Sequence, residues 1–298
     1  MRPLHPVPTS AVVLGLVLHL LGQCSSSSQT APASVQLFDG RTLNGWYTWL
    51  VDTRHDDPRH VFTVTNGWLR ISGDGLGYLA TRKAWADYTL KLEWRWGETN
   101  TRWGDRIGKA RDSGVFLNAT GPDGNSHDGN GAFMAAIECN LFEGACGDIL
   151  LIRGDHSDGT AIEPRITAEV AAAKDAEGWF TWLSGGRSQT LRRWGRLNWF
   201  GKSPQWQDAT GFRGLHDLEK PFGEWNHLEC ENVGGQLRLK LNGVLVNEAR
   251  DIYPTSGKIL LQCEGSEIFF RELTLHPHPE PLSPGVPQHP TRETTVAP

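Results

Sequence analysis

The chain has 298 residues, a formal net charge of −5, and 13 tryptophans against 4 tyrosines. That length accommodates one large β-sandwich or two modest domains. The sequence has no basic patch or arginine-rich run, which argues against nucleic acid as a partner. Tryptophan can fill a core or stack on a sugar ring, and core packing is the default for any single one.

The N-terminus has the pattern of an export signal. Arg2 precedes an apolar run over 11–21 that is too short to span a bilayer comfortably but suits a signal peptide. We therefore predict a signal peptide over 1–24 and a linker of Ser, Gln, Thr, Ala and Pro over 25–34. The protein is then expected in the periplasm or at the cell surface.

Cys24 is a candidate for lipidation. The tetrapeptide Leu21-Gly22-Gln23-Cys24 resembles a bacterial lipobox, although Gln23 departs from the small residue expected before the cysteine. Two outcomes stay open: a lipid on Cys24 that attaches the protein to a membrane, or simple cleavage nearby.

Alternating apolar and polar residues predict strands along much of the chain after the linker. The clearest segments are 88–96, 133–142 and 227–241. Gly234-Gly235 and Asn242-Gly243 are turn signals between strands. Short strands separated by Gly-rich turns predict an all-β fold, an antiparallel sandwich.

The segment 257–275 predicts two strands joined at Gly265-Ser266. Its apolar alternation shifts near Arg271, which predicts a β-bulge there. Gln262, Glu264 and Arg271 form a polar row that suits a sugar-binding groove, and an ordinary solvated face explains the row as well.

The least regular region is 150–222, which is rich in tryptophan. So many large aromatics argue against disorder, so we expect a long, ordered loop excursion over the rim of a groove. A short helix over 169–176 is the most that this region suggests. From residue 277 the tail is Pro-rich and expected to be disordered.

Several motifs resemble, in order, those of the 3-keto-disaccharide hydrolase domain family. Two of them are Asp112-Ser113-Gly114-Val115-Phe116-Leu117 and Ile137-Glu138-Cys139-Asn140; the others lie at 37–46, 62–69, 87–95, 224–227, 241–244 and 257–273. The resemblance covers 35–276. It implies a concanavalin-like jelly roll of two antiparallel sheets with a concave sugar-binding face, and cleavage of disaccharides oxidised to a ketone at C3.

Glu138 is the first candidate for catalysis. It lies on the strand face opposite the apolar residues, and Asn140 follows two positions later on the same face. A carboxylate beside an amide suits acid–base work and recognition of hydroxyl groups. A salt bridge with a neighbouring strand is the alternative. His127, which precedes this strand, is the best functional candidate among the histidines.

The remaining candidates lie on two other strands. Glu93 and Arg95 share one face and could lie near Glu138, although a ladder of ion pairs explains them equally well. Arg271 could pair with Glu264 and hold that carboxylate ionised. The predicted catalytic residues are thus Glu138, His127 and Arg271, and the predicted substrate-binding residues are Glu93, Arg95, Asn140, Gln262 and Glu264.

A sugar with a ketone at C3 can be cleaved without the two flanking carboxylates of an ordinary glycosidase. A base removes the acidified proton on C2, and the enolate expels the oxygen on C1, with or without later addition of water. Glu138 or His127 would be the base or acid, and Arg95 or Arg271 would stabilise the oxyanion.

Three other functions stay open. A carbohydrate-binding module without catalysis would have the same fold. A β-glucan hydrolase is disfavoured because the strand pattern E-x-D-x-x-E is missing, and a purely structural surface protein is the plainest alternative.

No cofactor is predicted with certainty. The histidines lack the spacing of a metal motif such as H-E-x-x-H, yet a divalent metal from distant loops remains possible. Cys139 and Cys146 could bridge a hairpin, whereas Cys230 and Cys263 lie in apolar registers typical of buried free thiols.

Overall fold

The computed structural model describes residues 32–127, 131–193 and 195–279. The predictions of a signal peptide, of most of the linker, of a lipid on Cys24 and of the tail beyond 279 lie outside these ranges. Within them, no helix has the length and hydropathy that a transmembrane span needs.

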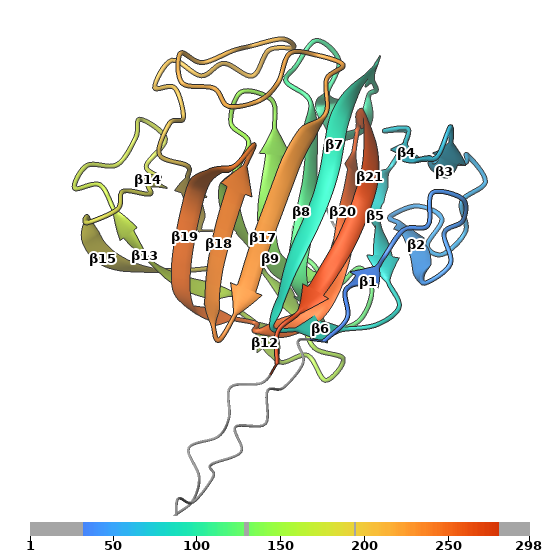
Figure 1. The fold of residues 1–298 in the computed structure, drawn as a ribbon, viewed down its shortest axis with the longest axis horizontal. Coiled ribbons are helices and arrows are strands. Elements are labelled where there is room, and N and C mark those ends of the chain that lie inside the picture. The colour runs from blue at the N-terminus through green and yellow to red at the C-terminus, as the bar shows by residue number, and fades with distance from the viewer. Residues whose placement is uncertain (1–31, 128–130, 194, 280–298) are drawn as a thin grey trace, which may run out of the picture. The chain divides into compact units, whose positions relative to one another are not determined.

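Two large sheets pack as layers, and the nearer one in Figure 1 is called sheet A. Sheet A has ten strands in the order β15 (Arg187–Arg192), β13 (Arg165–Val170), β19 (Val244–Tyr253), β18 (Gln236–Leu241), β17 (Asn226–Val233), β7 (Tyr88–Asn100), β21 (Ser266–Pro277), β4 (Trp68–Ile71) and β3 (Phe62–Thr65), with β1 (Val35–Gln36) also paired to β21.

Sheet B lies behind it and has nine strands. Their order is β14 (Phe180–Thr181), β16 (Arg196–Asn198), β10 (Asp148–Ile152), β9 (Ala135–Phe142), β8 (Asp112–Thr120), β20 (Ser256–Glu264), β5 (Leu76–Thr81) and β2 (Trp46–Leu50), with β6 (Trp85–Ala86) paired to β20. The only parallel pair among the described strands is β14 with β16. A ribbon of β11 (Gly154–Asp155) with β12 (Ala161–Ile162) and a 3₁₀ turn, η1 (Trp103–Asp105), complete the elements. The predicted all-β jelly-roll sandwich is confirmed.

Period-two alternation decides which side chains fill the space between the sheets. On β7, Leu92 and Trp94 are buried in the shared core while Glu93 points the other way. On β9, Ile137 and Cys139 face the same core, so that the side chain of Glu138 projects from the outer face of sheet B. Burial of these apolar surfaces is the main force that holds the layers together.

A second, smaller core covers part of the outer face of sheet B. Phe133, just before β9, packs on Phe116 and shares this core with Tyr78 and Leu260. Asp123, after β8, and Phe133 supply walls to two different cavities.

Glycine fixes two turns of the fold. Asn242 and Gly243 both have positive φ, 50° and 84°, and form the expected hairpin turn. Gly265 has φ 82°, and a Cβ there would collide with the carbonyl oxygen of Trp103. At Gly265 the chain leaves sheet B and enters sheet A, so the two strands it joins do not pair with each other.

The predicted bulge is confirmed, and the short helix considered for 169–176 does not form. The register of β21 shifts between Arg271 and Thr274, where Glu272 has φ 55°. Residues 169–176 are not helical, because β13 continues to Val170 and a turn follows. The described residues of the Trp-rich region supply β11 to β16 to the sheets and the small ribbon, so they do not run as one long loop.

The bridge considered between Cys139 and Cys146 does not form, since all four described cysteines are free. Both side chains are buried in the shared core, and Sγ of Cys146 donates to the carbonyl oxygen of Phe142 at 3.4 Å. Cys230 and Cys263 are buried thiols, as predicted.

Candidate functional site

A cavity of about 290 Å³ opens on the outer face of sheet B. Three neighbouring strands, β8, β9 and β20, bring their polar side chains to it at alternate positions. These residues are Asp112, Glu138, Asn140, Gln262 and Glu264, and the wall around them includes Phe133, Phe142, Trp179 and Arg196.

Gly114 makes room for the carboxylate at the centre of this cavity. It pairs with Asn140 across β8 and β9, two residues from the pair of Phe116 with Glu138 and on the same face. A Cβ on Gly114 would lie within 3.0 Å of three side-chain atoms of Glu138. Only a residue without a side chain lets Glu138 lie flat over β8.

Asn140 bridges two carboxylates. Its Nδ2 donates to Oε1 of Glu138 at 3.0 Å and to Oδ1 of Asp112 at 3.4 Å. Glu138, Asn140 and Asp112 therefore form one hydrogen-bonded cluster, although Asp112 comes from a different strand.

Two residues that line this cavity have a buried amide oxygen without a partner. Gln262 donates from Nε2 to Oε2 of Glu264 at 2.6 Å, but its Oε1 accepts no hydrogen bond within the described residues, and the same holds for Oδ1 of Asn140. The two residues are only 2% and 4% exposed. Buried acceptors normally have a donor, so these two oxygens are suited to the hydroxyl groups of a ligand.

Asp112 is a carboxyl group of the cavity whose pKa is clearly shifted. Burial raises its pKa to about 6, although the nearby Arg106 and Arg196 and the amide of Asn140 oppose the rise. Oδ2 of Asp112 lies 3.8 Å from Nη1 of Arg106. A carboxyl group with this pKa can give or take a proton near neutral pH.

Arg196 brings a fixed positive charge to the wall. Its Nε and Nη2 donate to Oδ2 of Asp148 at 2.9 and 2.6 Å, and Asp148 is fully buried. Burial opposes the charged form, but Asp148 outweighs it and raises the pKa of the guanidinium. Its Cζ lies 5.7 Å from the ring centroid of Phe142, so the guanidinium is held beside the cavity.

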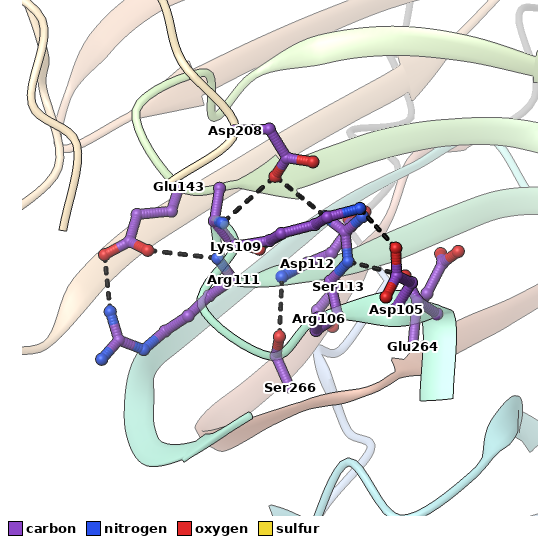
Figure 2. Close-up of polar contacts among 12 residues, drawn as sticks. Asp105, Arg106, Lys109, Arg111, Asp112, Ser113, Glu143, Asp208, Glu264 and Ser266 are labelled. Atoms are coloured by element: carbon purple, nitrogen blue, oxygen red, sulfur yellow. Dashed lines mark hydrogen bonds and ion pairs between the residues drawn. The ribbon is translucent and has the colours of Figure 1, made fainter. Parts of the chain in front are cut away.

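Polar contacts hold the segment that leads into β8, as Figure 2 shows. Asp208 accepts from the amide of Ala110 at 3.1 Å and from Nη1 of Arg106 at 3.3 Å. Glu143 accepts from Nη1 of Arg111 at 2.6 Å. The amide of Asp112 donates to Oγ of Ser266 at 3.0 Å, so the backbone that carries Asp112 is anchored on both sides of the sandwich.

The structure brings four of the predicted site residues together and separates the others. Glu138, Asn140, Gln262 and Glu264 line one cavity. His127 does not: its Nε2 lies 2.7 Å from Oδ2 of Asp155, near the small ribbon.

Arg271, Glu93 and Arg95 lie on the outer face of sheet A. Arg271 donates from Nε to Glu93 at 2.5 Å and lies over the ring of Trp225 at 4.1 Å, so the predicted pair with Glu264 does not form. Arg95 donates to the carbonyl oxygen of Gly223 at 3.2 Å. The crossover at Gly265 is the reason: it puts Glu264 and Arg271 in different sheets.

A family model described as the 3-keto-alpha-glucoside-1,2-lyase-like domain matches residues 33–276. The chain belongs to this family. Family membership links the protein to carbohydrate chemistry and confirms the resemblance seen in the sequence motifs. A search of curated proteins found no match.

Solved structures match this chain at low identity and with TM-scores below 0.5. A candidate glycosyl hydrolase from Parabacteroides distasonis ATCC 8503 is 15% identical with a TM-score of 0.45 over 82% of this chain and 93% of its own. A β-glucanase from Bacillus licheniformis is 8% identical with a TM-score of 0.41 over 84% and 100%. The carbohydrate-binding module CBM66 from Bacillus subtilis is 13% identical with a TM-score of 0.39 over 78% and 95%.

Two residues of this lyase-like domain's cavity were missed by the sequence reasoning. Asp112 had a usable signal, because it stands two positions before Gly114 and so shares the face of the polar strand residues. Arg196 had none: it lies on a three-residue strand in the least regular part of the chain, and its place beside Asp148 depends on the pairing of β10 with β16.

A divalent metal remains a prediction for this lyase-like domain. Within the described ranges, no three side chains of His, Cys, Asp or Glu are grouped as metal ligands. Asp112, Glu138 and Glu264 are the carboxylates of the cavity, and hard cations such as Mg²⁺ and Ca²⁺ prefer oxygen ligands of this kind.

Proposed function

We propose that this cavity cleaves glycosides that carry a ketone at C3 of the sugar. The ketone acidifies the C2–H bond, because removal of that proton gives an enolate. The enolate then forms a C1–C2 double bond while the C1–O bond breaks, and the departing oxygen takes up a proton. The products are an unsaturated keto sugar, to which water can add, and the free leaving group.

Glu138 is the base in this proposal, and Asp112 is the acid. Glu138 lies at the centre of the cavity, with its Oε1 oriented by the amide of Asn140. The pKa of Asp112, about 6, keeps a proton available for the leaving oxygen at mildly acidic pH. The bridge through Asn140 keeps the two carboxyl groups in a defined arrangement.

Arg196 and the unpaired amides complete the assignment. The guanidinium of Arg196 is the donor that would stabilise the negative oxygen of the enolate, since Asp148 keeps it charged and in place. Asn140 Oδ1 and Gln262 Oε1 would accept hydrogen bonds from sugar hydroxyls, with Glu264 beside them.

One observation carries the proposal: Asn140 joins two carboxyl groups in a cavity that also holds a guanidinium and two unpaired acceptors. A solvated strand face has no reason to combine a raised carboxyl pKa with buried oxygens that lack donors. The cavity, at about 290 Å³, is near the lower end of small-molecule pockets, which run from about 300 to 1,000 Å³.

Proton NMR of a methyl 3-keto-glucoside in D2O tests this function directly. We expect loss of the anomeric signal together with an enone resonance, or deuterium at C2, and the same reaction with a chelator tests the divalent metal. If the substrate signals only broaden and no product forms, the protein is a carbohydrate-binding module, and the catalytic proposal is wrong.

Export is a separate part of the proposal. We infer from the N-terminal pattern that residues 1–24 direct secretion and that Cys24 is a possible lipid attachment point. Mass spectrometry of the mature chain from expressing bacteria decides this, because a lipidated Cys24 would be the first residue and carry the acyl mass, whereas Cys24→Ser would lack it.

A further inference from the structure

A second cavity of about 600 Å³ lies beside Asp123. Its walls come from β2 and the segments on either side of it, from β5 and the turn after it, from β20, and from Asp123 in the segment after β8. Tyr47, His55, Arg82, Asp123 and Lys258 supply its polar groups. None of them belongs to the Glu138 cavity.

Asp123 organises one end of this cavity. The hydroxyl groups of Tyr47 and Tyr78 both donate to its Oδ1, at 2.5 and 2.8 Å. Burial, aided by Asp123 itself, raises the pKa of both tyrosines, so both keep the protons that they donate. Oδ2 lies 3.8 Å from Nε2 of His55.

Lys258 and Arg82 make the cavity positively charged. Lys258 donates from Nζ to the hydroxyl oxygen of Tyr47 at 2.6 Å, and its Nζ lies 4.6 Å from the centroid of that ring. The Cζ of Arg82 is 5.8 Å from the same centroid. Among the described residues neither cation has a carboxylate within 4.0 Å, so two cations face the single charge of Asp123.

We propose that this cavity binds the anionic substituent of an acidic sugar, a carboxylate or a sulfate ester. The hydroxyl group of Tyr47 donates to Asp123 and accepts from Lys258. The remaining N–H groups of Lys258 and the guanidinium of Arg82 are therefore available to bind an anion. The volume of about 600 Å³ lies within the range of small-molecule pockets, so it has room for the sugar that carries the charge.

This site stands independently of the chemistry proposed for Glu138. A competing explanation is purely structural: Asp123 would hold the segment directly after β8 against β2 and β5, and the cations would only cover Tyr47. The two explanations differ in whether charge on a ligand changes its affinity.

The test is isothermal titration of the Glu138→Gln protein, which separates binding here from turnover in the other cavity. Methyl glucuronide, methyl glucoside 6-sulfate and neutral methyl glucoside are the three probes. We expect at least one charged probe to bind about tenfold or more tightly than the neutral one, with affinity falling as salt rises; the two charged probes distinguish carboxylate from sulfate.

Lys258→Met and Arg82→Gln should each remove that preference for charge. Lys83→Met is the matched control, because Lys83 is exposed and stacks on Trp85 without lining the cavity. Equal affinities for charged and neutral probes, or a charge preference that survives in both cavity variants, would overturn the proposal. Arg82 is exposed, so its variant keeps the test valid even if Lys258→Met unfolds.

Discussion

The outer faces of sheets A and B carry similar polar residues, but these residues are paired in different ways. On sheet A, Glu93 meets Arg271 in a one-to-one pair whose side chains are 28% and 35% exposed, with Trp225 beside it. On sheet B, Asp112 and Glu138 share one amide inside a cavity. A polar row with an aromatic neighbour is therefore not enough to mark a site, whereas two carboxyl groups that share an amide inside a cavity, one of them with a raised pKa, are the stronger mark.

The largest effect expected from this contrast is on turnover. Glu138→Gln should lower the rate of cleavage of a 3-keto glucoside by about 10²–10⁴-fold, because the amide cannot take the C2 proton. Glu93→Gln makes the same chemical change on sheet A and should leave the rate within about twofold. NMR time courses of both variants at equal protein concentration make the comparison.

Unchanged thermal unfolding of Glu138→Gln is the control for folding. If Glu93→Gln were the inactive variant and Glu138→Gln the active one, the assignment of the site to sheet B would be wrong.

Gly114→Ala tests whether the position of Glu138 matters as well as its presence. The new methyl group would lie within 3.0 Å of Glu138 and must push its carboxylate away from β8. A displacement on the order of 1 Å at a catalytic group can cost about 10²-fold in rate, so we expect a loss of about 10- to 100-fold. Full activity in a folded Gly114→Ala protein, measured by the same NMR assay, would show that Glu138 does not need this position.

The raised pKa of Asp112 predicts a pH dependence. As the acid, Asp112 must be protonated, so turnover should fall as pH rises above about 6. Asp112→Asn should be slower and lack this alkaline limb; a pH–rate profile of both proteins checks it. A limb in the other direction, with activity lost below pH 6, would make Asp112 the base instead.

The raised pKa of Asp112 also predicts how the free energy of unfolding changes with pH. Its folded pKa, about 6, lies above the ordinary value of 3.8, so the folded state holds the proton longer than the unfolded chain does. The free energy of unfolding should therefore decrease as pH rises from about 4 to 6 and stay lower above that. Urea unfolding across this range should show a flatter profile for Asp112→Asn.

The sequence was enough to place Glu138 and Asn140 and to predict the sandwich, because period-two alternation is a local property of each strand. It was not enough to decide which strands are neighbours. Glu264 and Arg271 are separated by a single turn at Gly265, yet that turn changes sheets, and the collision that requires glycine there involves Trp103, far away in sequence. The position of Arg196 could not be predicted for the same reason, because it depends on Asp148, which only the fold brings next to it.

The smallest expected effect concerns the ion pair on sheet A. Because Glu93 and Arg271 are both partly exposed, their pair should contribute only about 0–1 kcal/mol to the free energy of unfolding. A double-mutant cycle with Glu93→Gln and Arg271→Met, measured by urea unfolding, gives this coupling, and about 1 M salt should reduce it because the Debye length then falls to about 3 Å.

The buried pair of Arg196 with Asp148 should behave differently, since Asp148→Asn leaves a buried guanidinium uncompensated and should cost about 3–5 kcal/mol. Equal costs on the two sheets would mean that burial does not distinguish these faces, which would remove the physical basis for placing the site on sheet B.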